Sequence, residues 1–572
     1  MKVSKNLKKF WLDTALIYLN WKKSPKIAFK KNNSNYFKWF PDGRINLYEN
    51  CIRRHLINEN KIAIITINNL NKIKQYSYSD IDFLISKANY FFENKKIKRV
   101  MINYSASIES AVAMLTCMKL GIHFCVVFED LESEAILKRS KLFKPDFIFT
   151  KKKRLFFKKF NKNIKFFDLG KILFLKNNNF LNKKISYFRS DKDLFTLFTS
   201  GSTGDPKGIV HSSGGYALYS QFTCVKKFGM NNNSIVLTAS DAGWINGHTY
   251  SLIGPLLIGC TTILLEKSTL LLNKKLLNDI LNRGVTILYL PVTLIRLMKE
   301  LFNKIKFKSN SLITLGSMGE PLAKAVGTWF SSAFNLPNKA IINTYYQTET
   351  GGIICSPSYS DRVIDSPHGS VGSKICKYLI LNKLAKKKKE IKILSPWPGC
   401  MKKVLNGKLF YKKYWDNNNN FKMFDFATKK INHKRKTSYI NVHGRVDDVI
   451  NIRGHRIGSE EVESVVLKLD QVVECCAISV DDDLEGSKLI LFVVAKKIIS
   501  NKINNIINSH FGSFALPRAI YYIKELPKTR SGKILRRLIR EILINPNKKL
   551  YSDTSTMLNP RLIIEIKKVL LN

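Results

Sequence analysis

The stretch from Phe195 to His211 constrains the fold more than any other part of the chain. An apolar run ends at Phe198, and Thr199-Ser200-Gly201-Ser202-Thr203-Gly204 follows, then Asp205-Pro206-Lys207-Gly208 and a second apolar run. Glycines let backbone N–H groups close around an anion, hydroxyl groups add donors, and a lysine adds a positive charge. The pattern therefore predicts two strands joined by a loop that binds a polyphosphate.

This loop differs from the phosphate loop of the NTPases, in which Gly-Lys-Ser/Thr opens a helix. Here Lys207 lies between Pro206 and Gly208, and the proline removes one N–H donor from the loop. A flexible surface loop is the alternative interpretation of this stretch taken alone.

Strands and helices alternate before the loop. Strands are predicted at residues 61–68, 99–105 and 123–128, and helices at 76–92 and 107–121. Ser79 or Asp80 can cap the first helix, and Gly121 ends the second. Strand–helix–strand repetition predicts an α/β fold with parallel-rich sheets and helices on both faces.

Length and charge limit the remaining possibilities. A chain of 572 residues is too long for one ordinary domain, so one large and one small domain are expected. The formal net charge of +52 would normally indicate nucleic acid or an anionic membrane surface. However, the lysines are spread from Lys2 to Lys568 among asparagine and isoleucine, whose codons are also A/T-rich. We therefore favour codon drift, with nucleic-acid binding as the alternative.

Cysteine spacing and hydropathy predict the compartment. The ten cysteines lie singly, apart from Cys475-Cys476, and none has zinc-site spacing. Reduced thiols and a cytoplasmic location are expected. No apolar run reaches membrane-spanning length, so we expect no membrane partner, while the oligomeric state is left open.

Two later segments, 314–322 and 342–354, each run from a strand into a Gly- or Thr-rich loop. Open α/β sheets bind ligands at the carboxyl ends of their strands. Glu349 is the best candidate for a metal ligand, because Mg²⁺ bound with ATP needs only one or two carboxylates besides phosphate oxygens and water. Tyr345 can stack on an adenine.

The charged turn Arg445-Val446-Asp447-Asp448 separates two ordered units and predicts a hinge before a small α+β domain. A salt-bridged linker is the alternative. Near the end of the chain, Lys533 follows a Ser-Gly turn in LPKTRSGKILRR, where a loop could insert a positive charge. A basic tail is the alternative there.

Together these motifs resemble the adenylate-forming acyl-CoA synthetase, or luciferase-like, superfamily. TSGSTGDPKG with IVHSSGGY is most similar to its AMP-forming acetyl-CoA synthetases, and the resemblance runs from Phe10 to about Arg540. It implies a large N-terminal adenylate-forming domain over residues 1–445 and a small, mobile α+β C-terminal domain over residues 446–572. The hinge would lie near Asp447.

The resemblance implies an acid-thiol ligase, an acetate–CoA ligase that uses ATP, Mg²⁺ and coenzyme A. Acetate would react with ATP to give acetyl-adenylate and pyrophosphate, and the acetyl group would then pass to CoA, releasing AMP. No Ser/His/Asp triad or cysteine nucleophile motif competes with this interpretation. The alternatives are a propionyl- or other short-chain acyl-CoA synthetase and, less favoured, a degenerate enzyme that binds nucleic acid.

The resemblance also assigns roles to matching positions. Catalysis falls to Lys533, Arg456 and His248, although His248, like Trp244, read alone is typical of a packed core. ATP or AMP binding falls to Thr199, Ser200, Gly201, Ser202, Thr203, Gly204, Lys207, Gly319, Glu320, Pro321, Thr344, Tyr345, Gln347, Thr348, Asp425, Arg445 and Arg456. The acyl pocket comprises Ile245, Asn246, Met318 and Tyr346, the hinge is Asp447, CoA binding falls to Arg453, and the metal ligand is Glu349.

The chain departs from the family at three positions. Asn343 stands where the family commonly has an aspartate near the adenine, and Arg453 replaces a small residue near the CoA thiol channel. No arginine for the CoA phosphates is present near Asn508. These departures bear on transfer to CoA more than on adenylation.

Overall fold

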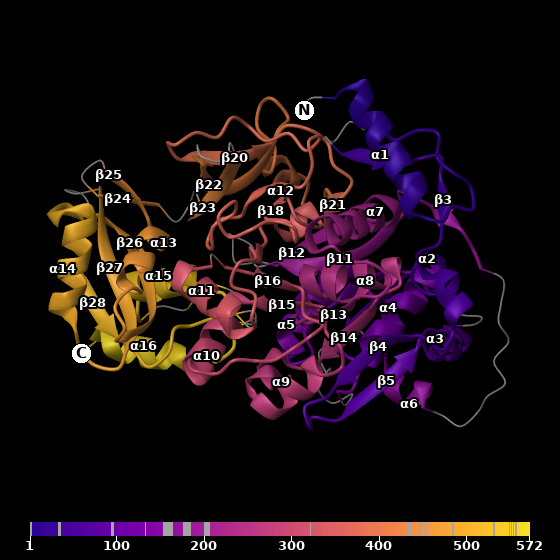
Figure 1. The fold of residues 1–572 in the computed structure, drawn as a ribbon, viewed down its shortest axis with the longest axis horizontal. Coiled ribbons are helices and arrows are strands. Elements are labelled where there is room, and N and C mark those ends of the chain that lie inside the picture. The colour runs from indigo at the N-terminus through magenta and orange to yellow at the C-terminus, as the bar shows by residue number, and fades with distance from the viewer. Residues whose placement is uncertain are drawn as a thin grey trace.

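The computed structural model describes residues 3–31, 36–92, 97–131, 133–152, 164–174, 185–199, 206–320, 322–405, 407–432, 437–445, 449–452, 455–482, 486–529, 532–547, 550, 552, 554 and 557–571. Its order of elements is mixed α/β (Figure 1). This agrees with the fold class predicted from the alternating strands and helices.

The first of two seven-stranded sheets carries the Phe195–His211 stretch. Its strands, in spatial order, are β21 (Lys403–Val404), β12 (Lys207–Ser212), β11 (Asp193–Thr199), β7 (His123–Val126), β6 (Arg99–Asn103), β8 (Phe147–Thr150) and β9 (Lys165–Phe167). The strands from β11 to β9 are parallel, whereas β12 and β21 pair antiparallel at one edge.

The second sheet lies beside the first and is also mostly parallel. Its order is β17 (Ile342–Asn343), β16 (Thr314–Met318), β15 (Ile287–Pro291), β13 (Ile235–Thr238), β14 (Thr261–Leu265), β4 (Ile62–Ile67) and β5 (Ile73–Ser77). Only β5 pairs antiparallel within it. Most of the parallel strands are buried along their length, which explains their near-continuous apolar sequences.

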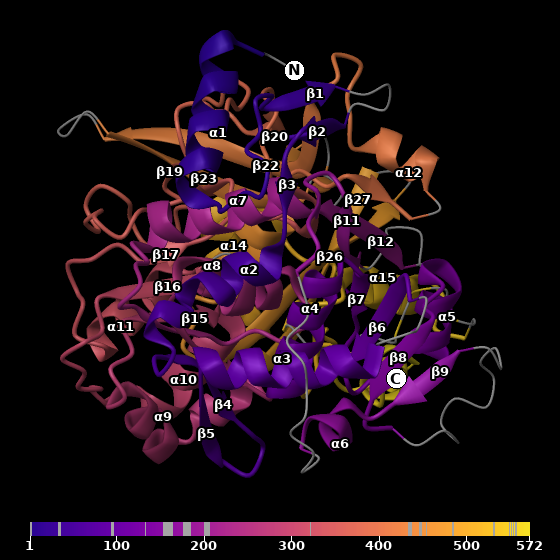
Figure 2. The same ribbon diagram turned by 90° about the vertical axis from the view of Figure 1, so that its right-hand side faces the viewer.

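Helices cover and separate the two sheets. They are α1 (Lys5–Tyr18), α2 (Leu47–Cys51), α3 (Tyr78–Phe92), α4 (Ile108–Leu120), α5 (Ser133–Phe143), α6 (Leu169–Leu173), α7 (Ser213–Thr223), α8 (Gly254–Ile258), α9 (Lys274–Leu281), α10 (Val292–Phe302), α11 (Lys324–Ala333) and α12 (Lys408–Lys413). One continuous core joins α3, α4, α7 and α8 to β4 and β6. Figure 2 shows α1 lying against α7.

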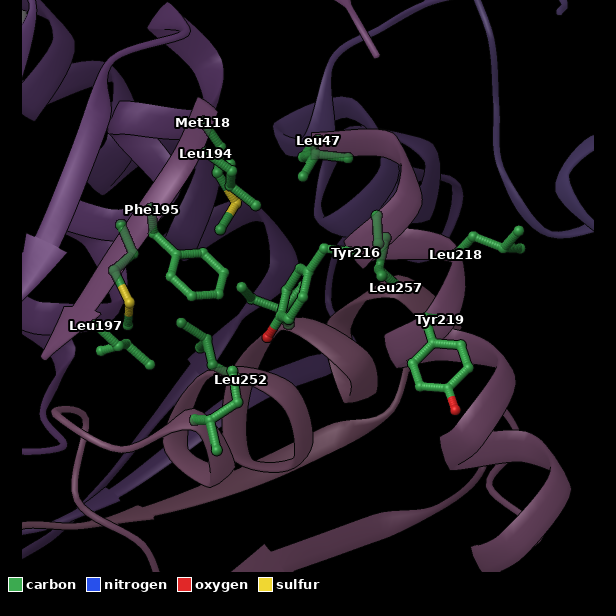
Figure 3. Packing of buried hydrophobic residues seen from close by; sticks show 14 of the residues in the cluster. Leu47, Met118, Leu194, Phe195, Leu197, Tyr216, Leu218, Tyr219, Leu252 and Leu257 are labelled. Carbon is green, nitrogen blue, oxygen red and sulfur yellow. The ribbon is translucent and has the colours of Figure 1, made fainter. Parts of the chain in front are cut away.

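The strand before the predicted phosphate loop is anchored in this core. Phe195 of β11 packs edge-on against Tyr216 of α7, with ring centroids 4.8 Å apart. Figure 3 shows both rings among Leu194, Leu197 and Leu252. The loop therefore begins from a rigid base.

Shorter turns and strands complete the large part of the molecule. The 3₁₀ and π-helical turns are η1 (Arg53–Asn58), η3 (Cys224–Phe228), η4 (Gly247–Ile253), η5 (Ser268–Leu272) and η6 (Thr348–Thr350). A three-stranded sheet contains β20 (Lys389–Ile393), β22 (Phe421–Asn432) and β23 (Thr437–Arg445). The remaining pairs are β1 (Phe29–Lys31) with β2 (Phe37–Trp39), β3 (Arg44–Ile45) with β10 (Phe188–Arg189), and β18 (Cys355–Ser356) with β19 (Ser373–Lys374).

The C-terminal elements form a separate group, drawn in orange and yellow in Figure 1. They are β24 (Val449–Ile452), β25 (His455–Gly458), α13 (Ser459–Val466), β26 (Val472–Asp482), β27 (Gly486–Ala495), α14 (Ser500–Phe511), η8 (Ser513–Ala515), β28 (Ala519–Tyr522), α15 (Arg536–Ile544) and α16 (Leu562–Leu571). Two apolar clusters cover opposite faces of the β26–β27–β28 sheet. The predicted hinge Asp447 lies outside the described residues, so the boundary at 445/446 stays a prediction.

One local prediction needs correction. Helix α3, which Ser79 or Asp80 was predicted to cap, begins at Tyr78, because Ser77 Oγ accepts the Asp80 N–H and the Asp80 carboxylate accepts the Ser77 N–H.

None of the ten cysteines forms a disulfide bond, and nine of them are buried. Within the described ranges, no helix is both long enough and apolar enough to cross a membrane.

Candidate active site

A cleft of about 2530 Å³ lies between the large part of the molecule and the C-terminal group. Its lining includes the carboxyl ends of β11, β15, β16 and β17 on one side. The segment from Lys524 to Glu541 lines the other side. This is where open parallel sheets usually hold their ligands.

The two ends of the predicted phosphate loop border this cleft. Thr199, the last residue of β11, pairs with Lys207, the first residue of β12, and both line the cleft. The strand–loop–strand prediction is therefore confirmed at its two ends. Residues 200–205, which include Ser200, Gly201, Ser202, Thr203 and Gly204, lie outside the described residues.

Asp425 forms the centre of a polar group on β22. Its Oδ2 accepts hydrogen bonds from the Tyr345 hydroxyl at 2.6 Å and from Gln347 Nε2 at 2.8 Å. Gln347 Nε2 also donates to the Met423 carbonyl at 2.6 Å. Asp425 and Arg445 are paired in register between β22 and β23. The structure thus brings together positions that were predicted to bind the nucleotide from two distant segments.

Glu349 lies in the turn η6 and also lines the cleft. The Tyr414 hydroxyl donates to its Oε1 at 2.6 Å, which orients the buried carboxylate. His211 Nε2 donates to the carbonyl of Thr348, the residue before Glu349, at 2.7 Å. This hydrogen bond joins β12 to the turn η6. Burial lowers the pKa of His211 to about 4, so the ring is neutral near pH 7.

The four predicted acyl-pocket residues meet at one end of the cleft. Met318 is the last residue of β16, and the Asn246 amide donates to its sulfur. Ile245 and Tyr346 complete the set, and all four line the cleft. Burial raises the pKa of Tyr346 well above its ordinary value, so the phenol stays protonated.

Behind Tyr346 stand two tyrosines that the sequence did not single out. The Tyr289 hydroxyl lies 3.4 Å from that of Tyr346 and 2.7 Å from the hydroxyl of Thr344. The Tyr250 ring meets the Tyr346 ring edge-on, with centroids 5.6 Å apart. Tyr289 lies on β15, two positions before Pro291, the strand end that borders the cleft. This position near the carboxyl end of a parallel strand is the sequence signal that could have identified Tyr289.

The loop after β16 contributes Gly319 and Glu320. Gly319 has φ +90°, and a side chain there would meet no atom within 4 Å, so the backbone is open at this point. Glu320 forms an ion pair with Arg296 of α10. Pro321 lies outside the described residues. Asn343 is buried and holds its loop by donating to the Ser370 carbonyl at 3.0 Å.

Lys533 reaches the same cleft from the C-terminal group. It stands on a tight hairpin in which the Thr529 N–H donates to the Lys533 carbonyl at 2.8 Å. The Gly532 N–H donates to the Thr529 carbonyl, also at 2.8 Å. Lys533 is exposed, and thus its ammonium is available to a molecule in the cleft.

Other predicted residues are not brought to the cleft. His248 is fully buried, with its ring centroid 4.6 Å from that of Phe195 and 5.9 Å from that of Phe124, and it does not line the cleft. Burial lowers its pKa to about 3. A catalytic role for His248 therefore finds no geometric support. Asn508 is exposed on α14 and does not line the cleft either.

The structure describes only the backbone of the two arginines that were predicted to bind the nucleotide. Arg445 ends β23 and Arg456 lies in β25, but nothing is described of their side chains. Arg453 and Asp447 lie outside the described residues. Their assigned roles remain predictions.

The donor set of the cleft fits a magnesium ion that arrives with a nucleotide. Glu349 supplies hard carboxylate oxygen, and phosphate oxygens and water complete such sites. Across the described ranges, no three histidine, cysteine or acidic residues converge as a self-sufficient metal site.

Comparison with known families covers most of the chain. Residues 56–396 match the family described as AMP-binding enzyme, residues 461–533 match the AMP-binding enzyme C-terminal domain, and residues 2–51 match the acetyl-coenzyme A synthetase N-terminus.

Curated relatives and solved structures agree with these matches. An acetyl-coenzyme A synthetase of Helicobacter pylori is 31% identical, over 98% of this chain and 92% of the relative. One of Pasteurella multocida is 29% identical, over 98% and 93%. An acetoacetyl-CoA synthetase from Streptomyces lividans superposes with a TM-score of 0.84 at 15% identity, over 99% of this chain and 93% of that one. At that identity the likeness concerns the fold alone.

Proposed function

The chain belongs to the AMP-binding enzyme family, among the AMP-forming acetyl-CoA synthetases, and on that premise we propose that it joins acetate to coenzyme A at the expense of ATP. The observation that carries the proposal is the convergence of Lys533, Glu349, Asp425 and Lys207 on one cleft. These residues come from both parts of the molecule, and each supplies a charge that the chemistry requires.

The first step is formation of acetyl-adenylate. A carboxylate oxygen of acetate forms a bond to the α-phosphorus of ATP, and the bond from that phosphorus to the bridging oxygen breaks, so pyrophosphate leaves with the electron pair. Such a step depends on positioned positive charge rather than on a protein nucleophile. Lys533 stabilises the carboxylate and the α-phosphate, and Lys207 with residues 199–204 holds the β- and γ-phosphates. Glu349 would hold Mg²⁺, which would neutralise charge on the phosphates.

Asp425 and its neighbours hold the nucleoside. The Asp425 carboxylate accepts hydrogen bonds from the ribose hydroxyls, and its bonds from Tyr345 and Gln347 fix its orientation. Tyr345 stacks on the adenine, and Arg445 and Arg456 reach the ribose and phosphates. Gly319 lets the backbone approach the nucleotide without a side chain in between.

The second step is transfer to CoA. The thiol sulfur attacks the acyl carbon, the bond from that carbon to the phosphate oxygen breaks, AMP leaves, and the thiol proton passes to solvent. We place the domain boundary at 445/446, with Asp447 as the hinge that exchanges the adenylation arrangement for a transfer arrangement. Arg453 contacts CoA near its thiol.

The acyl pocket supports a short carboxylate. Ile245, Met318 and Tyr346 are bulky, and all three line the cleft, with Met318 at the end of β16. One methylene group changes the free energy of discrimination between two carboxylate substrates by only about 1–3 kcal/mol. Propionate is therefore the alternative substrate. The cysteines, none of which forms a disulfide bond, support a cytoplasmic location.

The test is ATP–pyrophosphate exchange, followed by assay of CoA thioester formation, with acetate, propionate and butyrate in parallel. Acetate should give the highest kcat/KM, and Lys533→Ala should lower exchange by about 10²–10³-fold, as expected for loss of a transition-state charge. Lys497→Ala, an exposed lysine outside the cleft lining, is the matched control and should exchange normally. Exchange with none of the three acids would overturn the proposal.

A further inference from the structure

The hairpin that carries Lys533 rests on the first turn of α10. Gly532, with φ +83°, approaches Thr293 so closely that a side-chain carbon on Gly532 would lie 2.5 Å from both Thr293 Oγ1 and Cγ2. Gly532 and Lys533 are neighbours in the chain, and Thr293 lines the same cleft. The two parts of the molecule thus touch directly beside the lysine.

Two ion pairs lie near this contact, one in each part of the molecule. Arg296 of α10 forms an ion pair with Glu320, and Arg536 at the start of α15 donates to Glu463, with Nε and Oε1 3.2 Å apart. Burial raises the pKa of Glu463, and the nearby Glu320 carboxylate acts in the same direction. The two ion pairs therefore lie near each other, with Arg296 three residues from Thr293 and Arg536 three residues from Lys533.

Thr293 is also tied to the predicted acyl pocket. Pro291, the last residue of β15, pairs in register with Met318 of β16, and α10 begins at the next residue. Thr293 therefore lies two residues after Pro291, which pairs with the predicted pocket residue Met318. One rigid strand–helix junction fixes both the pocket and the surface on which the lysine hairpin rests.

We propose that Thr293 is a positioning residue for adenylation, which sets the reach of Lys533 through its contact with Gly532. The proposal rests on the proposed function, in which Lys533 serves the first step. The contact is tight enough that added bulk at position 293 displaces the hairpin. Misplacement of a catalytic group by about 1 Å can cost on the order of 10²-fold in rate.

The test compares the two half-reactions in Thr293 variants of the full chain. Thr293→Leu adds bulk and should lower the kcat of acetate-dependent pyrophosphate exchange by about tenfold to a hundredfold. Its rate of acetyl transfer from supplied acetyl-adenylate to CoA should stay within about twofold of the unmodified chain. Thr293→Val keeps the shape of the side chain and should behave normally in both assays. Exchange that is unchanged in Thr293→Leu, or an equal fall of both half-reactions, would overturn the proposal.

A double-variant cycle tests the contact itself. Gly532→Ala should impair exchange because its new carbon overlaps Thr293, and Thr293→Gly should restore part of the lost rate. Backbone strain at φ +83° is common to the single and the double variant, so it cannot produce this rescue. Absence of any rescue would count against the contact.

Trypsin cleavage after Lys533 gives a readout that does not depend on activity. Because the docked hairpin is held against α10, Thr293→Leu should be cut there several times faster than Thr293→Val. One outcome is that the unmodified chain shows no pyrophosphate exchange with any short acid while this difference in cleavage is present. In that case the proposed function fails, but the contact between the hairpin and α10 is supported. Equal cleavage rates in the two variants would contradict the contact between the hairpin and Thr293.

Discussion

At the scale of single residues, two carboxylates in the cleft accept hydrogen bonds from tyrosine hydroxyls. Tyr345 donates to Asp425, and Tyr414 donates to Glu349, both at 2.6 Å. Each carboxylate comes from a different part of the chain from its tyrosine, so tertiary packing fixes its orientation. A bound nucleotide with its cation would meet acceptor groups that are already in place.

The metal role of Glu349 leads to the first prediction at this scale. Glu349→Gln keeps the shape and can still accept the Tyr414 hydrogen bond, but it removes the negative charge. The Mg²⁺ concentration that gives half-maximal pyrophosphate exchange should rise by about tenfold or more, while the KM for acetate stays nearly constant.

Tyr414→Phe is the matched control for Glu349→Gln. It leaves the carboxylate in place and removes only the hydrogen bond that orients it. Its shift in Mg²⁺ dependence should be smaller than that of Glu349→Gln. An unchanged magnesium titration in Glu349→Gln would contradict the assignment.

The sequence predicted several motif residues that line the cleft, but it did not predict the residues that contact them. Glu349, Asp425 and Lys533 stand in recognisable local patterns, and all three line the cleft. Tyr414 and Thr293 belong to no motif, because their importance arises from contacts with residues far away in the chain. His248 was predicted to be catalytic from its Gly-His motif, which fits a packed core equally well, and the structure buries it fully.

At the scale of elements, the segment after β13 shows how one glycine shapes a pocket wall. Gly247 begins η4, and a side-chain carbon there would lie 2.2 Å from the Asp241 carbonyl oxygen. The backbone folds back tightly at this point, which carries Ile245 and Asn246 to the cleft. A π-helical turn of this kind is often found at functional sites.

Gly247→Ala should therefore disturb the acyl pocket. The added methyl group collides with backbone atoms, which yield less readily than a side-chain tip, so the free energy of unfolding should fall by about 1–3 kcal/mol. The KM for acetate should rise more than the KM for ATP, because Ile245 and Asn246 move first. Urea unfolding and steady-state kinetics measure the two effects.

Ser240→Ala, in the same loop but with no added atom, is the control for Gly247→Ala. It should leave both quantities nearly unchanged. Equal rises of the two KM values in Gly247→Ala would show that the turn does not shape the acyl pocket in particular.

Element boundaries reflect polar contacts that the apolar pattern does not encode. Among the buried parallel strands, β4, β6 and β7 were predicted because their sequences are mostly apolar. In contrast, β5 was not, because IKQYS is mostly polar and lies at a sheet edge. The start of α3 depends on the reciprocal bonds of Ser77 and Asp80 rather than on hydrophobic spacing.

At the scale of the whole molecule, the cleft needs both parts of the chain. The sequence predicted two units in order along the chain, but their docking depends on shape at Thr293 and Gly532, which no local pattern records. The net charge of +52 adds self-repulsion that salt can screen. The large part also buries histidines, so stability should depend on pH as well as on salt.

Burial lowers the pKa of His55, His123 and His211 to about 4 and that of His248 to about 3. The unfolded chain takes up these protons near pH 6.5, whereas the folded chain does not until pH 3–4. Their stabilising contribution is therefore complete above pH 6.5 and is lost as the pH falls toward 4. Each fully buried imidazole should remove about 1.4 kcal/mol per pH unit in this window.

Tryptophan fluorescence can follow this loss, since the tryptophans lie between Trp11 and Trp415, in the same part of the molecule as the four histidines. The urea midpoint should fall steeply from pH 7 to pH 5, and added salt should raise the midpoints without removing the slope. His248→Phe should reduce the slope by the contribution of one proton. A midpoint that is constant over this range would mean that these rings are not held neutral by the fold.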